Sequence, residues 1–228
     1  IIMIKNIIFD LDDTLLDFQR GEYEGVRSIL KNAGAPDIEE AFKIYGQINA
    51  TVWQQIESGE AAQPLLNRRF SDTLNLLNIK SDGQQLERIY RQHLNHNFHV
   101  IPGATNLLKQ LKSNGFRLIV GTNGVAKTQH ERLVGSGINS YFDEIFISEE
   151  IGYRKPEPQF FETILNNNPD RNISNTVMVG DRLSADIVGA NAVGMKSIWY
   201  NPHQNQATSK AAPTYIANDY QDILNLIL

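Results

Sequence analysis

The chain has 228 residues, of which 41% are hydrophobic, so it is long enough to bury a substantial core. Its 21 basic and 26 acidic residues leave a net charge of −5, and no basic stretch suits a phosphate backbone. There is no cysteine. These features exclude a nucleic-acid polymer as partner, and they exclude disulfides, thiolate metal sites and cysteine nucleophiles.

Short apolar runs rich in β-branched residues predict strands at 4–9, 117–121, 144–148, 176–180, 196–200 and 214–217. None of these runs approaches the length of a membrane span. Lys5 interrupts the first run, which favours a buried strand over a secretory signal. We therefore expect a cytoplasmic protein without membrane attachment.

Helical periodicity fills the intervals between the later strands, at 103–113, 126–136, 158–167 and 183–192. The interval after the first strand is longer than an ordinary crossover and is helical throughout, at 19–32, 38–58, 64–78 and 82–98. Alternating strands and helices predict a parallel sheet covered on both faces. The predicted fold is therefore α/β, with a Rossmann-like parallel-sheet core (1–17 and 99–228) and an inserted α-helical cap domain (18–98).

Residues that carry chemistry follow four of the predicted strands. They are Asp10-Leu11-Asp12-Asp13-Thr14 after the first, Thr122-Asn123-Gly124 after the second, Lys155-Pro156 in the loop after the third, and Gly180-Asp181 with Asp186 after the fourth. Ligands bind at the carboxyl ends of the strands in open α/β sheets. We therefore expect these four segments to form one site.

Four carboxylates in this set, Asp10, Asp12, Asp181 and Asp186, face a single lysine, Lys155. Such a cluster repels itself and raises the pKa of some of its members. A divalent cation removes the conflict, and a ligand set made only of oxygen atoms suits Mg²⁺. The sequence therefore predicts a magnesium site.

The same segments supply hydrogen-bond donors for the oxygens of a bound anion: the Thr122 hydroxyl, the Asn123 amide and the Lys155 ammonium. A metal and donors around a carboxylate nucleophile fit phosphoryl transfer to an aspartate. Asp10 is then the candidate nucleophile. Asp12 is the candidate acid/base, and that role needs a pKa above the ordinary value of about 3.9.

With these four motifs in this order, the chain resembles the haloacid dehalogenase superfamily over nearly its whole length. The resemblance implies that Asp10 becomes an aspartyl-phosphate and binds Mg²⁺. It implies that Asp12 is the general acid/base and that its backbone carbonyl binds the same ion.

The resemblance also assigns roles to the later motifs. Thr122 and Lys155 match positions that bind the transferring phosphoryl group, Asp181 matches an acidic metal ligand, and Asp186 matches a position more often outside the direct ligands. The helical insertion resembles the smaller helical cap of that family, so we expect a small-molecule phosphate monoester as substrate.

A finer resemblance concerns residues 49–60 of the cap and 147–152 of the core. Both stretches are similar to bacterial pyrimidine 5′-nucleotidases that clear noncanonical nucleotides. The resemblance implies hydrolysis of pyrimidine nucleoside 5′-monophosphates.

Several alternatives stay open. Within the superfamily they are a sugar-phosphate phosphatase and a phosphosugar mutase; Asp12 argues against a 2-haloacid dehalogenase, because displacing halide needs no acid for the leaving group. A non-catalytic binding module is a further alternative, although Asp10 and Asp12 are both retained.

Arg68 and Arg69 in the cap fit a solvated or salt-bridged face better than a substrate contact. The sequence leaves the oligomeric state open.

Overall fold

A computed structural model describes residues 4–207 and 211–228; residues 1–3 of the predicted core and 208–210 lie outside the described part. The chain divides into two compact units. The sheet unit contains the chain up to Asp17 together with Phe98–Leu228, and the helical unit is Phe18–Asn97. Phe98 belongs to the sheet unit, and its ring lies against Gly135 there.

The sheet unit is built on a six-stranded sheet in the order β3-β2-β1-β4-β5-β6, and every neighbouring pair is parallel. The strands are β1 (Asn6–Phe9), β2 (Arg117–Thr122), β3 (Glu144–Ile147), β4 (Thr176–Gly180), β5 (Lys196–Tyr200) and β6 (Tyr215–Ala217). Phe9 is in register with Val120 of β2 and with Val179 of β4. The carboxyl ends of these three central strands therefore lie side by side, and the predicted parallel sheet is confirmed.

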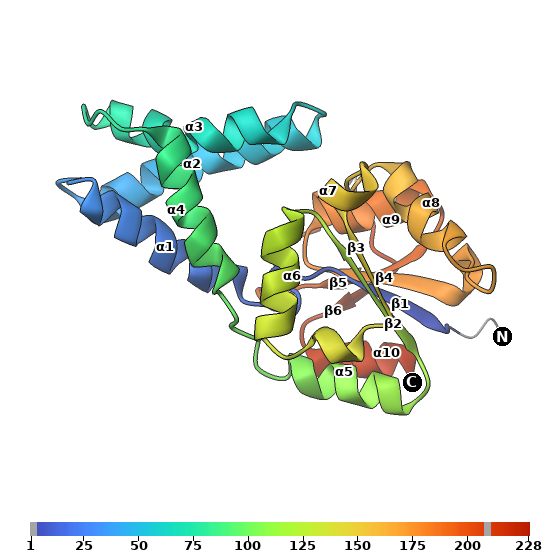
Figure 1. Cartoon of the computed structure of the whole chain (residues 1–228). Coiled ribbons are helices and arrows are strands. Elements are labelled where there is room, and N and C mark those ends of the chain that lie inside the picture. Colours follow the sequence, from blue (N-terminus) through green and yellow to red (C-terminus); the bar gives the residue numbers. More distant parts are fainter. Residues whose placement is uncertain (1–3, 208–210) are drawn as a thin grey trace. The chain divides into compact units, whose positions relative to one another are not determined.

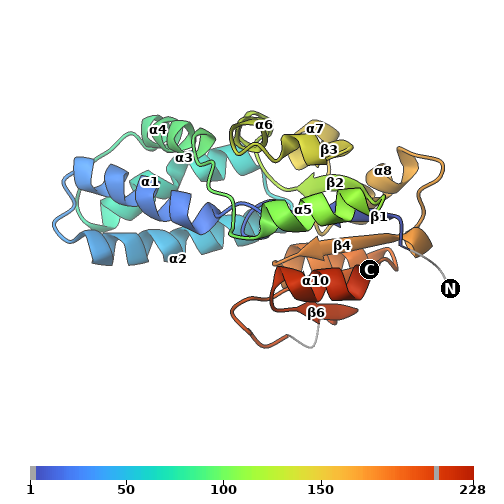
Figure 2. The ribbon, with the colours of Figure 1, turned by 90° about the horizontal axis from the view of Figure 1, so that it is seen from below.

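Helices cover the two faces of this sheet. They are α5 (Ala104–Ser113), α6 (Ala126–Gly135), α7 (Ser148–Ile151), α8 (Pro158–Asn166), α9 (Val188–Ala192) and α10 (Tyr220–Ile227). Figure 1 shows α5 and α10 on one side of the sheet and α8 and α9 on the other; seen from below, α5 and α10 lie in front of the strands (Figure 2). Ile7 and Phe9 pack with the first pair of helices, whereas Ile8 between them packs with the second. Burial on both faces explains why the strands read as continuous apolar runs.

Three segments differ from the sequence prediction. The helix α10 was not predicted, and Ser148 begins α7 instead of ending β3. The segment predicted as one helix over 183–192 is a π-helical turn, Leu183–Ile187, followed by α9. Asp186, whose polar contacts are described below, lies in this π-helical turn.

The helical unit contains four helices, α1 (Phe18–Asn32), α2 (Ile38–Glu57), α3 (Ala62–Leu76) and α4 (Gly83–Asn95). All four were predicted, and α4 ends before the expected 98. Asp37 and Asp82 start α2 and α4 by accepting a backbone N–H three residues on, at 3.0 Å in each case. The Tyr45 ring stacks on Phe70, and Phe70 meets the Tyr90 ring edge to face, so these rings join three of the helices in a buried core.

Among the described helices, none combines the length and apolar composition that crossing a membrane requires.

Candidate active site

The loop after β1 is a tight turn that presents the first two acidic residues. The Asp10 N–H donates to Val179 O in the neighbouring strand at 2.9 Å. Asp13 has a φ of 56°, in the left-handed region that aspartate tolerates better than most residues. Its N–H donates to Leu16 O at 2.7 Å, which closes the turn. The loop conformation is therefore fixed by backbone hydrogen bonds.

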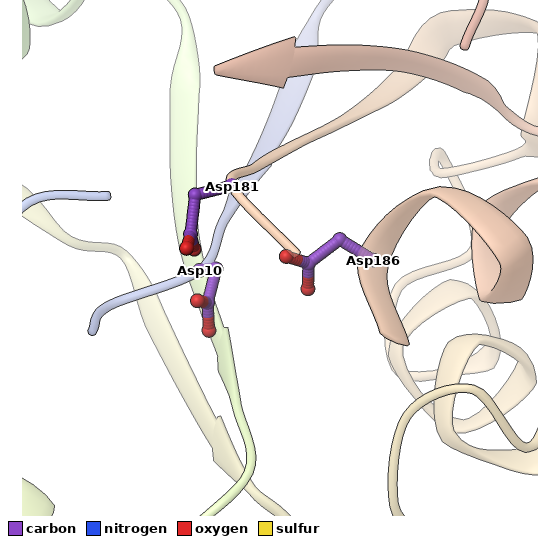
Figure 3. Close-up of side chains that lie close together, drawn as sticks. All are labelled: Asp10, Asp181 and Asp186. Carbon is purple, nitrogen blue, oxygen red and sulfur yellow. The ribbon is translucent and has the colours of Figure 1, made fainter. Parts of the chain in front are cut away.

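Three of the four predicted carboxylates come together: Asp10, Asp181 and Asp186 point toward one another (Figure 3). One oxygen from each lies within 4.8 Å of the others. The Lys155 ammonium lies between two of them and donates to Asp10 Oδ1 at 2.6 Å and to Asp186 Oδ1 at 2.7 Å. All of these groups are buried except Asp181, which is partly exposed. The structure thus brings Lys155 together with three of the four carboxylates that the sequence placed in one site.

The electrostatics of the cluster follow from burial and from the excess of acids. Burial raises the pKa of Asp10 to about 7 against the attraction of Lys155, and the nearby Asp186 adds to the rise. Burial raises the pKa of Asp181 well above its ordinary value, and Asp10 and Asp186 reinforce the effect. Burial alone would lower the pKa of Lys155, but its two carboxylate partners raise it above its ordinary value. The lysine therefore stays charged, and ionising all three carboxyl groups would place more negative charge in the cluster than the lysine neutralises.

This donor set fits a hard divalent cation. Carboxylate oxygens at this spacing are ligands that Mg²⁺ prefers, and a cation would lower the cost of ionising Asp10 and Asp181. Asp186 already uses both oxygens, because Oδ1 accepts from Lys155 and Oδ2 accepts from Arg182 N–H at 2.9 Å. Asp10 and Asp181 are thus the better candidates for direct ligands, and Asp186 is better placed to hold the lysine.

Neighbouring residues fix Asp181 in place. The Thr14 hydroxyl donates to Asp181 Oδ1 at 3.0 Å and accepts from the Asp181 N–H at 3.1 Å. The Tyr220 hydroxyl of α10 donates to Thr14 O at 2.8 Å, and Trp199 Nε1 donates to Asp181 O at 2.8 Å. The helix that was not predicted therefore supports the first motif of the site.

Gly180 is required by Asp186. A Cβ atom at Gly180 would lie 2.2 Å from Asp186 Oδ2, closer than any non-bonded contact allows. The glycine that ends β4 thus provides the space that the carboxylate occupies.

Asn123 lies beside the lysine loop. Its Nδ2 donates to Lys155 O at 2.8 Å, and its Oδ1 accepts from Lys155 N–H at 2.9 Å. This pair of bonds holds the main chain of Lys155, whose peptide bond to Pro156 is cis. The sequence predicted an anion-binding role for Asn123, and the structure gives its amide this contact with the lysine loop.

Asp12 is not one of the three grouped carboxylates, whereas the sequence had placed it with them. Its Oδ1 forms an ion pair with Nη1 of Arg132, which is completely buried in α6. Its Oδ2 accepts from Gln129 Nε2 at 3.0 Å, and the same amide nitrogen donates to Thr122 Oγ1 at 2.9 Å. The three-residue spacing of Gln129 and Arg132 places them on one face of the helix after Thr122-Asn123-Gly124. That spacing is the signal that could have identified them.

The fold and this site together define a Rossmann-like α/β protein with an aspartate-rich centre at the carboxyl ends of its strands. The family model for haloacid dehalogenase-like hydrolases matches residues 7–200. This chain therefore belongs to the haloacid dehalogenase-like hydrolases.

Particular relatives resemble it over nearly their full length. Pyrimidine 5′-nucleotidase PynA of Streptococcus pneumoniae is 36% identical, over 98% of this chain and 94% of the relative. Pyrimidine 5′-nucleotidase YjjG of Escherichia coli is 29% identical, over 97% of this chain and 96% of the relative. A crystal structure of YfnB from Bacillus subtilis bound to magnesium matches with a TM-score of 0.92 and 32% identity, and the match covers 99% of each chain.

Proposed function

We propose that this chain is a Mg²⁺-dependent phosphomonoesterase that hydrolyses pyrimidine nucleoside 5′-monophosphates through an aspartyl-phosphate on Asp10. The observation that carries the proposal is the buried Asp10 carboxylate, held at 2.6 Å by Lys155 and grouped with Asp181. The names of the relatives PynA and YjjG support the substrate class, and the magnesium in the YfnB structure supports the cation.

The carboxylates of Asp10 and Asp181 and the backbone carbonyl of Asp12 would hold the Mg²⁺ ion. Bound there, Mg²⁺ supplies positive charge that offsets the negative charge of the phosphoryl oxygens and of the acidic cluster. Asp186 would not bind the ion directly. Its Oδ1 accepts from Lys155 at 2.7 Å and its Oδ2 accepts from the Arg182 N–H at 2.9 Å, so it holds Lys155 in place.

The reaction takes place in two steps. In the first, which starts with Asp12 protonated, a carboxylate oxygen of Asp10 bonds to phosphorus, the bond from phosphorus to the ester oxygen breaks, and that oxygen takes the proton of Asp12. In the second, water attacks the aspartyl-phosphate and gives a proton to Asp12, which frees phosphate and restores Asp10. Lys155 and the Thr122 hydroxyl donate hydrogen bonds to the phosphoryl oxygens in both steps. One water molecule is consumed for each ester.

The sequence predicts a cap domain over residues 18–98. We assign to this helical unit the selection of the substrate by its leaving group. The residues of the sheet unit described above account for the phosphoryl group and the cation, and none of them is assigned to a nucleoside. Residues 49–60 of the helical unit carry the similarity to pyrimidine 5′-nucleotidases and are the first candidates for mutagenesis.

The test is phosphate release from a panel of nucleoside monophosphates and sugar phosphates, with Mg²⁺ or with EDTA. Wild-type protein is compared with Asp10→Asn and with Asp72→Asn, which changes an exposed carboxylate in the helical unit. We expect Mg²⁺-dependent hydrolysis of pyrimidine monophosphates that Asp10→Asn abolishes and Asp72→Asn preserves. A preference for sugar phosphates would keep the mechanism and reject the nucleotidase assignment. No hydrolysis of any ester would reject the phosphatase assignment.

A further inference from the structure

Gln129 connects two groups of the proposed reaction through a single amide. It lies in α6, is 2% exposed, and its Nε2 donates to Asp12 Oδ2 at 3.0 Å and to Thr122 Oγ1 at 2.9 Å. Its Oε1 accepts from Arg132 Nη1 at 3.0 Å. A primary amide has two N–H hydrogens, and both are used here.

The partners determine which way the amide faces. A guanidinium group only donates hydrogen bonds, so the atom facing Arg132 must be the amide oxygen. The nitrogen then faces the Asp12 carboxylate and the Thr122 hydroxyl. The orientation of Gln129 is therefore set by chemistry, and a carboxylate at this position could not reproduce it.

This orientation also determines the role of the Thr122 hydroxyl. Because its oxygen accepts from Gln129, its own O–H is directed elsewhere, and its recorded contact with Asn123 O is a long one of 3.5 Å. The hydroxyl is thereby prepared to donate to a phosphoryl oxygen. Gln129 thus sets the hydrogen-bond direction at a candidate phosphate-binding residue.

The Thr122-Asn123-Gly124 motif is shaped around this amide. A Cβ atom at Gly124 would lie 3.1 Å from Gln129 Cγ and 3.2 Å from Gln129 Nε2, which is tighter than most real contacts. Glycine at this position therefore leaves room for Gln129, in addition to favouring a turn.

We propose that Gln129 is a positioning residue that holds the Thr122 hydroxyl as a donor and the Asp12 carboxyl group, protonated before the first step, at the leaving oxygen, with Arg132 anchoring the Gln129 amide. This inference rests on the proposed phosphatase function. Gln129 keeps its protons throughout, since the proton that reaches the leaving oxygen comes from Asp12. Without Gln129, Asp12 would be less well placed to give its proton, so the reaction should slow most for leaving groups that need a proton.

The test uses the best substrate of the phosphate-release panel and its analogue in which sulfur replaces the bridging ester oxygen. A thiolate leaves without protonation, so only the oxygen ester depends on Asp12 as an acid. We expect Gln129→Met to lower kcat about 100-fold on the oxygen ester and only about 10-fold on the sulfur analogue, with KM changed little. Asp12→Asn is the reference for complete loss of the acid and should show the same selectivity more strongly.

Two further variants keep the inference falsifiable if Gln129→Met is poorly folded. Gly124→Ala displaces Gln129 without removing it and should shift the oxygen-to-sulfur ratio in the same direction by a smaller amount. Gln129→Glu retains the size but not the donors, and it should not rescue activity. Equal losses on both substrates, or no loss, would overturn the positioning role while wild-type turnover upholds the phosphatase. A wild-type protein inactive on both substrates would overturn the two proposals together.

Discussion

Each unit of this protein buries an ionic cluster, and the two clusters are built on different principles. In the helical unit, Arg69 and Glu87 form a two-point ion pair at 2.9 and 3.0 Å, with both side chains almost fully buried. The partly exposed Arg91 also donates to Glu87 Oε1, at 2.7 Å, so no carboxylate of this cluster lacks a cation. Asn49 accepts from Arg69 at 2.9 Å, and the guanidinium lies 4.8 Å from the centre of the Tyr90 ring. The sequence favoured a solvated or salt-bridged face for Arg69; the salt bridge is confirmed, and the side chain is buried instead of solvated.

The cluster in the sheet unit has no such balance. Asp10, Asp181 and Asp186 share one ammonium, that of Lys155, and burial raises the pKa of two of the three carboxyls. A buried ion pair with matched partners gives structural definition, whereas unmatched buried charge is costly and is retained where chemistry needs it. The comparison teaches that the balance of charge, more than burial itself, separates a structural cluster from a functional one.

The largest expected effect is on activity in the unbalanced cluster. Asp10→Asn removes the proposed nucleophile and should lower kcat by about 1,000-fold or more while the fold is retained. The measurements are steady-state phosphate release and circular dichroism. Activity within a few fold of wild type would remove Asp10 from the mechanism.

The balanced cluster should respond in stability. Glu87→Ala leaves the Arg69 guanidinium buried without its two-point partner and should destabilise the protein by about 3–5 kcal/mol in urea unfolding. The double variant Arg69→Met/Glu87→Leu should recover most of that loss, because it removes the buried unpaired charge, and the Arg91 that also loses its contact with Glu87 is partly exposed to water. The matched control is Glu24→Ala, which breaks an exposed ion pair with Arg20 and should cost less than about 1 kcal/mol. A double variant as unstable as Glu87→Ala would contradict this interpretation.

The clusters should also differ in their response to Mg²⁺. At 100 times its dissociation constant, a bound cation stabilises the folded state by about 2.7 kcal/mol, which thermal unfolding detects as a higher Tm. We expect this rise in wild-type protein and in Arg69→Met/Glu87→Leu, and its loss in Asp181→Asn. An equal response from Asp181→Asn and wild type would place the cation elsewhere.

The last expected effect is a pH dependence of stability in EDTA. Asp10 has a folded-state pKa of about 7 against an ordinary 3.8, so the folded protein binds this proton more tightly than the unfolded chain does. Raising the pH through that window therefore lowers the stability of wild-type protein, and the contribution levels off above about pH 7. Asp10→Asn has no carboxyl group to ionise, which favours its stability at high pH. It also loses the attraction between Asp10 and Lys155, so this gain in stability over wild type is partial. The Tm advantage of Asp10→Asn over wild type should grow from pH 5 to pH 8, and a constant difference would contradict the shift.

The sequence predicted the elements that depend on local pattern. All six strands and the four helices of the helical unit follow from apolar periodicity, and Lys155, Asp181 and Asp10 meet because parallel strands end at the same edge. The helix α10 was missed because its short apolar pattern follows directly on a three-residue strand.

The finer parts of the site could not be predicted, because they depend on where side chains point. The sequence grouped Asp12 with the other carboxylates, but its side chain pairs with Arg132 and Gln129 of α6. Periodicity places those two residues on a common helix face without saying which residue they meet across the sheet edge. Likewise, the space that Gly180 leaves for Asp186 depends on the turn at 183–187.

The hydrogen bond from Tyr220 to Thr14 spans 206 residues of sequence. During synthesis, the first motif leaves the ribosome long before α10 exists to support it. At a translation rate of about 5–20 residues per second, on the order of ten seconds or more pass between the synthesis of Thr14 and that of Tyr220. The β1 strand is likewise made long before β4, which pairs with it in the sheet. In a nascent chain of this protein, the first motif therefore gains the support of Tyr220 only after α10 has been made.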